Sequence, residues 1–228
     1  MHDGLPAELT RRHEEILDAA LTSMSEHGVG GTSLRALAAT VGMQQPSLYT
    51  YFRTKDELVE QVVAWGTRQM TTWQPELPFP ERLGELPRFV ARFVTELYTK
   101  PRHPRFVRFL FAASLEQPSL RPRIRQVFVD ALVAASEAIM SPFVLQGLVD
   151  EERAGILGRM VTNSIALPLI EERVLLAEPT ISERTLRYIA VSTEALTRLF
   201  EQIEAEGRER AGDTGRGSPR GSSSPRAK

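Results

Sequence analysis

Residues 32–55 read TSLRALAATVGMQQPSLYTYFRTK, and this stretch decides how the chain folds. Apolar residues recur at helical spacing in its first half, at Leu34, Leu37, Ala38 and Val41. Gly42 then interrupts the pattern, and a second short segment over about 45–52 carries a proline in its first turn, where a missing amide costs least. The stretch therefore predicts two short amphipathic helices joined by a tight turn, which is a helix-turn-helix pattern.

The composition limits the classes of protein to which the chain can belong. The 228 residues include no cysteine and four scattered histidines, so neither a thiolate metal site nor a cysteine nucleophile is expected. The first residues lack an apolar signal region, and the longest apolar run, near residues 165–170, is too short to span a membrane. We therefore expect a soluble, cytoplasmic protein without a metal or other cofactor.

Charge is unevenly distributed along the chain, although the net charge is only −1. Between Glu26 and Asp56 there is no acidic residue at all, and this window holds Arg35, Arg53 and Lys55. A polyanion can approach such an acid-free surface without repulsion. The charge pattern thus favours nucleic-acid binding by the helix-turn-helix segment.

Helical periodicity continues through the rest of the chain, so the fold class is all-α. We expect residues 1–54 to form a three-helix helix-turn-helix domain and residues 55–206 to form a larger helical bundle for ligand binding and dimerisation. Thr54 and Glu57 have the spacing of a capping box, which would start the first helix of that bundle. Residues 207–228 lack large apolar side chains and read as a disordered basic tail, either a solubilising terminus or a weak nucleic-acid contact.

The helices expected from periodicity and from proline and glycine positions follow one another with short connections. Their approximate ranges are 10–27, 33–41, 45–52, 55–73, 81–99, 104–116, 122–140, 150–175 with a bend at Pro168, and 182–206.

Polar side chains at the start of the second short helix have the chemistry of a DNA-reading surface. Glutamine amides, here Gln44 and Gln45, can pair with an adenine edge, and Pro46 can pack on a thymine methyl group. Hydroxyl groups and flanking cations suit phosphate oxygens. Taken singly, each of these residues also fits an ordinary role as a half-buried packing group or a solvated helix charge.

The motif Thr32-x-x-Arg35-x-Leu37-Ala38-x-x-Val41-Gly42-Met43, followed by Pro46-Ser47-Leu48-Tyr49-x-Tyr51-Phe52-x-x-Lys55-x-x-Leu58, resembles the TetR family of transcriptional regulators. The resemblance implies an all-α homodimer that represses transcription at a palindromic operator on double-stranded DNA and is usually released by a small molecule. The apolar stripes of the bundle suggest no buried acid and so favour a small, largely apolar effector. The resemblance also implies a set of DNA contacts: Thr32, Arg35, Gln44, Gln45, Pro46, Ser47, Tyr49, Tyr51 and Lys55. The chain departs from many members in having Gln44 where a serine or threonine would cap the recognition helix.

Aromatic and polar residues after residue 78 suggest a ligand pocket in the bundle. The candidates are residues on helices that would pack together: Phe89, Phe93, Phe109, Phe128, Met160 and Asn163. Asn163 would orient the ligand by hydrogen bonding. Ordinary core packing is the alternative for each of them.

The last expected helix carries apolar residues at alternating steps of three and four, which is a seam that needs a partner. Together with the preceding helix it predicts a four-helix dimer interface. The residues assigned to it are Ile156, Met160, Ile165, Leu186, Ile189, Thr193, Leu196 and Phe200. Packing of the same seam within one subunit is the alternative.

Other classes of function are less well supported by the residues. A helical small-molecule binding or adaptor protein, with a helix-turn-helix that serves protein contacts, remains an alternative. An enzyme is not expected, because the sequence shows no paired carboxylates, nucleophile elbow or phosphate loop. The sequence leaves open whether a regulator of this kind would repress or activate, and it names neither operator, genes nor effector.

Overall fold

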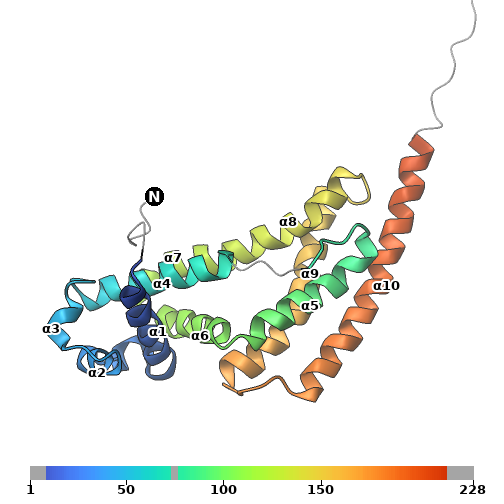
Figure 1. Ribbon diagram of the computed structural model, residues 1–228. Coiled ribbons are helices and arrows are strands. Elements are labelled where there is room, and N and C mark those ends of the chain that lie inside the picture. Colours follow the sequence, from blue (N-terminus) through green and yellow to red (C-terminus); the bar gives the residue numbers. More distant parts are fainter. Residues whose placement is uncertain (1–8, 73–76, 215–228) are drawn as a thin grey trace, which may run out of the picture.

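The computed structural model describes residues 9–72 and 77–214, and every regular element in these ranges is a helix (Figure 1), which confirms the all-α fold. The α-helices are α1 Arg11–Gly31, α2 Leu34–Thr40, α3 Gln45–Leu48, α4 Lys55–Thr72, α5 Leu86–Thr99, α6 Arg102–Glu116, α7 Arg121–Ile124, α8 Ala131–Leu145, α9 Glu151–Leu169 and α10 Glu183–Thr214. Short 3-10 segments are η1 Leu83–Glu85 and η2 Pro118–Leu120, and the π-helical segments are η3 Arg125–Asp130 and η4 Ile170–Leu175.

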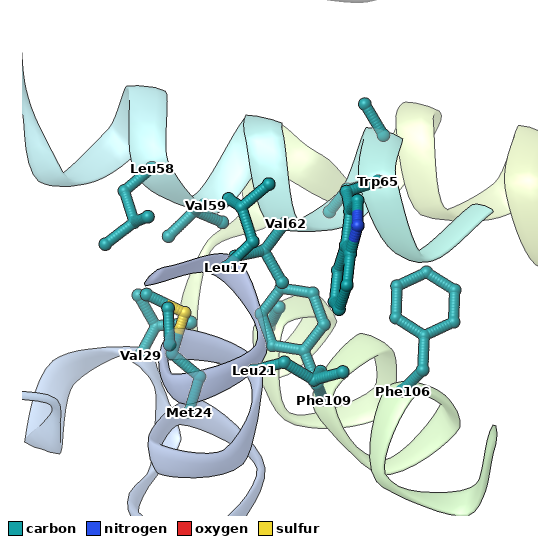
Figure 2. Packing of buried hydrophobic residues seen from close by; sticks show 14 of the residues in the cluster. Leu17, Leu21, Met24, Val29, Leu58, Val59, Val62, Trp65, Phe106 and Phe109 are labelled. Carbon is teal, nitrogen blue, oxygen red and sulfur yellow. The ribbon is translucent and has the colours of Figure 1, made fainter. Parts of the chain in front are cut away.

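The first of two hydrophobic cores joins the helix-turn-helix to helices of the larger bundle. Figure 2 shows that apolar side chains from α1, α4 and α6 interdigitate, with Trp65 of α4 beside Phe106 of α6. The buried residues labelled there are Leu17, Leu21, Met24, Val29, Leu58, Val59, Val62, Trp65, Phe106 and Phe109. Helices α4 and α6 therefore complete the core of the N-terminal unit, so the expected boundary after residue 54 does not separate two cores.

The second core lies in the body, between α5, α8, α9 and α10. Its fully buried centre consists of large apolar side chains from these helices, among them Phe143, Val161, Ile165 and Phe200. Helix α6 contributes Val107 to this core, while its Phe106 and Phe109 belong to the first one. One helix thus connects the two cores through opposite faces.

The capping box at the start of α4 is present. The Glu57 amide donates to the Thr54 hydroxyl at 3.1 Å, and the Glu57 carboxylate accepts from the backbone amide of Arg53 at 2.7 Å. In a capping box this carboxylate usually accepts from the amide of the N-cap residue, which is Thr54 here. In this chain it accepts instead from the amide of the preceding residue, Arg53. The cap fixes where the chain turns from the recognition unit into α4.

Residues 118–145 run as one long helical segment, through η2, α7, η3 and α8, instead of starting near residue 122. By length and composition alone, this segment is apolar enough to cross a membrane, with a mean hydropathy of 1.6. The expectation that no apolar segment reaches that length is therefore corrected. The sequence shows no conspicuous apolar run there because alanines, charged residues and prolines are interspersed at the exposed positions of the segment.

Pro168 does not end α9, which instead changes into the π-helical segment η4. A proline removes one backbone donor from the helix and disturbs the preceding turn. The Arg108 guanidinium from α6 then donates to the carbonyls of Val174 and Arg173 at 2.8 and 2.9 Å. A side chain from another helix therefore satisfies backbone groups at the irregular end of α9.

Helix α10 continues to Thr214, past residue 207, where the sequence predicts the start of a disordered tail. Gly207 is not a helix terminator but a point of close approach, because a Cβ there would collide with the backbone of Leu148. Arg210 also donates to the Leu148 carbonyl at 3.3 Å. The tail prediction is wrong for residues 207–214, and residues 215–228 lie outside the described ranges.

Glu204 is a buried carboxylate that ties η1 to α10. It accepts from the Gly84 amide at 3.0 Å and pairs with Arg208 at 2.6 Å and Arg82 at 3.5 Å. Burial by itself would raise the pKa of Glu204, but the Gly84 amide, Arg208 and Arg82 together lower that pKa below its usual value.

We predict that Glu204→Gln lowers the free energy of unfolding by about 1–3 kcal/mol at neutral pH, because the ion pairs are lost. A lowered pKa in the folded state gives stability above the unfolded pKa that is lost as the pH falls through the folded value. The difference in free energy of unfolding between Glu204→Gln and the unaltered protein should therefore shrink in acid. Urea unfolding at neutral and acidic pH measures this difference. Exposed Glu209→Gln is the control, and a pH-independent difference would contradict the charge argument.

Candidate nucleic-acid interface

The turn between α2 and α3 has the geometry that the sequence predicts. Gly42 adopts φ +63°, a left-handed conformation that favours glycine, and its amide donates to the Ala39 carbonyl at 3.0 Å. Leu37 of α2 and Leu48 and Phe52 after the turn are buried in the first core. Three apolar anchors therefore hold the two short helices on α1 and α4.

Helix α3 has four residues, followed by turns through Tyr51. Its N-cap residue, Gln44, makes no side-chain capping bond, in keeping with glutamine being a poor cap. The Gln44 amide group is exposed and available for an external partner.

Most of the predicted contact residues share one exposed surface on α2, the turn and α3. Arg35, Gln44, Pro46, Ser47 and Tyr49 are exposed, with Tyr49 at 47%, and Gln45 is partly exposed. We call these six residues the reading face. They bring amide, hydroxyl and guanidinium donors together without a carboxylate between them.

Thr32 is not part of the reading face, which corrects its assignment as a DNA contact. Its side chain is only 3% exposed, and its hydroxyl donates to the Gly28 carbonyl at 2.9 Å. Ser33 takes the exposed N-cap position of α2 instead and accepts from the Ala36 amide at 3.4 Å. Thr32 therefore closes the end of α1 and does not face outward.

Lys55 has a structural role that its charge alone does not reveal. Its ammonium group donates to the carbonyls of Thr32 at 2.7 Å and Gly30 at 3.3 Å. These carbonyls lie at the C-terminal end of α1, where a cation is favoured by the helix dipole. Lys55 thus fixes the entry into α2 from across the domain.

Tyr51 is half-buried, and its ring meets the His13 ring edge to face at 5.3 Å. His13 in turn bonds Gln61 at 2.7 Å, and Gln61 donates to the Tyr51 carbonyl at 3.1 Å. The Tyr51 ring therefore packs between α1 and α4, in agreement with the packing role that the sequence left open.

Two exposed residues beside the reading face escaped the sequence-based list of contacts. Thr50 and Arg53 follow α3 and are both exposed. The acid-free window contains both, so charge distribution was the signal that pointed to them.

Helix α6 holds the end of α1 through a carboxylate. The Glu116 side chain accepts from the Gly30 amide at 2.7 Å, and Gly28 adopts φ +73° directly beside it. A Cβ on Gly28 would collide with this carboxylate. A second link joins Arg102 of α6 to Asp18 of α1 at 3.0 Å. Body and helix-turn-helix are thus joined by polar contacts at both ends of α6.

Only part of the set predicted to form a ligand pocket packs against one core. Phe89, Phe93, Phe128 and Met160 are half-buried against the second core, with the rings of Phe89 and Phe93 stacked 6.3 Å apart. Phe109 is fully buried in the first core, and Asn163 is exposed on α9. Asn163 therefore does not orient a ligand inside the bundle, because its helix turns it outward. Sequence reasoning missed Phe79, whose ring is 5.4 Å from that of Phe89.

The seam of α10 packs inside its own chain. Five of the residues assigned to a dimer interface are buried in the second core: Ile165, Ile189, Thr193, Leu196 and Phe200. They contact the body, so their assignment to a partner surface is corrected. Ile156 at 63% and Leu186 at 45% are exposed, and Met160 is half-buried.

The fold and the reading face define an all-α protein with an N-terminal helix-turn-helix unit and a helical body. Residues 16–62 match the family model described as bacterial regulatory proteins, tetR family. The match covers the helix-turn-helix unit and the first part of α4, so this part of the chain is similar to the N-terminal region of tetR-family regulatory proteins.

Curated proteins similar to this chain are transcriptional regulators. The chain is 28% identical to the transcriptional regulator AqdR of Rhodococcus erythropolis over 60% of this chain and 65% of that protein. It is 33% identical to the transcriptional repressor KstR2 of Mycolicibacterium smegmatis over 28% of this chain and 31% of that protein. The chain thus spans less than two thirds of the length of these curated relatives.

Solved structures show the same fold. A TetR-family regulator from Mesorhizobium loti superposes with a TM-score of 0.60 at 17% identity, covering 84% of this chain and 98% of that one. A complex of SmeT with triclosan superposes with a TM-score of 0.56 at 22% identity, covering 82% and 91% of the two chains.

We predict that Glu116→Gln loosens the end of α1, because a charge-assisted hydrogen bond to the Gly30 amide becomes a weaker neutral one. The free energy of unfolding should fall by about 1 kcal/mol. Hydrogen exchange at the Gly30 amide should accelerate, which NMR can follow. Glu60→Gln, an exposed change on α4, is the matched control. Unchanged protection at Gly30 would show that the carboxylate contributes nothing to this end of the helix.

Proposed function

We propose that this chain is a transcriptional repressor that binds a palindromic operator as a dimer and is released by a small, largely apolar effector. The observation that carries the proposal is the reading face, which is exposed, free of acids and mounted on buried anchors. The similarity of the chain to a transcriptional repressor, KstR2, supports repression over activation.

The reading face divides between sequence recognition and phosphate binding. Gln44, Gln45 and Pro46 lie at the start of α3, where the end of a recognition helix meets base edges in the major groove. Ser47 and Tyr49 are exposed on the same helix end and can donate hydroxyl groups to phosphate oxygens. Arg35 on α2 supplies a charged phosphate contact on the other side of the turn.

A dimer is needed because a palindrome offers two half-sites about 34–36 Å apart. Helices α9 and α10 pack side by side (Figure 1), and both keep apolar side chains on their outer faces. These exposed residues are Ile156, Leu167, Tyr188, Val191 and Leu199. This outer surface of α9 and α10, instead of the buried seam, is the proposed dimer interface.

An effector would act through the body and α6. The exposed ring of Phe79 and the half-buried rings of Phe89 and Phe93 suit an apolar or aromatic compound, and SmeT was solved with triclosan. Helix α6 contacts both cores and holds α1 through Glu116 and Arg102. A displacement of α6 by the effector would therefore move the reading face, and operator DNA must weaken effector binding by the same factor.

The test of the function is selection of bound sites from random duplex DNA, followed by affinity measurements at several salt concentrations. We expect a palindromic sequence and a steep loss of affinity, by roughly 10³–10⁵-fold between 50 and 200 mM salt for 6–10 phosphate contacts. Recovery of no common sequence and a flat salt response would instead favour an adaptor protein that uses its helix-turn-helix for protein contacts.

We predict that Gln45→Ala and Tyr49→Phe act differently on DNA binding. Gln45→Ala should reduce discrimination at one or two base pairs by about 1–3 kcal/mol, because a base-reading amide is lost. Tyr49→Phe should weaken all sequences alike, because only a phosphate contact is lost. Affinities for a panel of single-base operator variants measure both effects. If Gln45→Ala leaves the preference profile unchanged, the amide does not read bases.

We predict that Val191→Glu converts the dimer into monomers, because it places a charge at an exposed position of 66% on the outer face of α10. Analytical ultracentrifugation should show a lower mass and an unchanged helix content by circular dichroism. Glu194→Gln, a polar change on the same helix, is the control and should leave the dimer intact. A dimeric Val191→Glu protein would place the interface elsewhere.

A further inference from the structure

A pocket of about 630 Å³ lies where the turn between α5 and α6 meets α1 and α4. It is separate from the stacked phenylalanines of the body. Its lining comes from four helices and one turn: Asp18, Gly66, Gln69, Met70, Leu97, Lys100, Pro101, Arg102, His103, Arg105 and Phe106. A volume of this size suits a small organic molecule better than a single ion.

Three cationic side chains and one acid line the pocket. Arg102 is matched by Asp18 at 3.0 Å and also lies over the Trp65 ring, 5.0 Å from its centroid. Arg105 donates to the neutral Thr22 hydroxyl at 3.1 Å, a partner that leaves its charge uncompensated. Lys100 adds a third positive charge. Its ion-pair partner Glu96, 3.7 Å away, is not one of the residues that line the pocket. The pocket wall is therefore net positive and favours an anion.

His103 provides the second, independent observation. Its side chain is only 7% exposed, and its Nδ1 atom is buried without a hydrogen-bond partner among the described residues. Burial lowers the pKa of His103 to about 4, so the ring is neutral at pH 7 and has one N–H to donate. An orphaned buried polar atom is costly, and because His103 lines the pocket, a rotation of its ring would let a ligand oxygen satisfy that atom.

The position of α6 adds to the attraction. The pocket includes the first turn of this 15-residue helix, whose N-cap residue Pro101 makes no side-chain capping bond. The helix dipole favours negative charge at this end, although the His103 amide already donates to the Lys100 carbonyl at 3.1 Å and Pro104 has no amide to donate. On the other side, Met70, Leu97 and Phe106 give the pocket an apolar wall.

We propose that this pocket binds a small organic anion, with its carboxylate or phosphate group between Lys100, His103 and Arg105 and its apolar part on Met70, Leu97 and Phe106. The site does not depend on the proposed DNA binding, because every group that forms it belongs to the free chain.

Calorimetric titration of the DNA-free protein with four probes tests the proposal: octanoate, octyl phosphate, inorganic phosphate and octanol. We expect at least one of the two octyl anions to bind saturably and at least about tenfold more tightly than octanol, since a charge-assisted contact is worth about that factor. The stronger anion identifies the head group, and weaker binding of inorganic phosphate supports the apolar wall. Binding of octanol as tight as that of both anions, or no anion binding, would overturn the proposal.

Charge-removing variants locate the site. Lys100→Gln and Arg105→Gln should each weaken anion binding several-fold, whereas Arg125→Gln, which removes a charge that is 76% exposed on η3, should not. Circular dichroism shows whether each variant is folded. Equal affinities for all three variants and the unaltered protein would place the anion elsewhere and sink the proposal.

A measurement on the unaltered protein removes any dependence on variants that fail to fold. An anion beside His103 favours the protonated ring, so its pKa should rise from about 4 when octanoate or octyl phosphate is bound. NMR titration of the imidazole C–H signals measures this shift. An unchanged His103 titration at saturating anion would show that the ligand does not occupy this pocket.

Discussion

The packing of α1 against α6 is the contact on which the position of the helix-turn-helix depends. Helices α2 and α3 have seven and four residues and are too short to be stable alone. They take their shape from α1 and α4, and α1 is in turn fixed on α6 by the apolar contacts around Phe109 and by the polar links at Asp18 and Gly30. The N-terminal unit is therefore incomplete without α6, which begins at Arg102, 71 residues after α1 ends at Gly31. The orientation of α6 determines where the reading face points.

Charged side chains complete the backbone at several places where a helix ends or becomes irregular. Lys55 binds the carbonyls at the end of α1, Arg108 binds those of η4, and Glu204 accepts from the amide of η1. In each case the backbone group and the side chain are far apart in sequence. These ionic groups thus act as tertiary caps, and the same charges would look like ordinary surface residues in a linear reading of the chain.

The sequence predicted the local features that depend on short-range physics. The Gly42 turn, the capping box at Thr54 and the buried anchors Leu48 and Phe52 all follow from spacing and side-chain type. Features that depend on distant contacts were missed. The α10 seam fits an inner or an outer partner equally well by periodicity, and only the packed fold shows that Phe200 is buried inside one chain. In the sequence, Gly207 resembles a helix terminator, and only the fold shows that it is needed because α10 packs closely on the backbone of Leu148. The outward position of Asn163 likewise depends on how α9 is rotated in the bundle.

In the short helix α3, the residues that stabilise the fold are different from the exposed residues that would read DNA. Its anchors, Leu48 and Phe52, point inward, while its exposed side chains make few contacts that the fold requires, and Gln44 does not even cap the helix. Exchanging the exposed residues would therefore leave the folded state almost unaffected, since surface changes away from structural features usually alter stability by less than about 0.5 kcal/mol. In the proposed DNA-binding role, a few substitutions at these exposed positions would change which sequence is read and leave both cores unchanged. Divergence of the proposed DNA targets among duplicated copies would thus meet little resistance from folding.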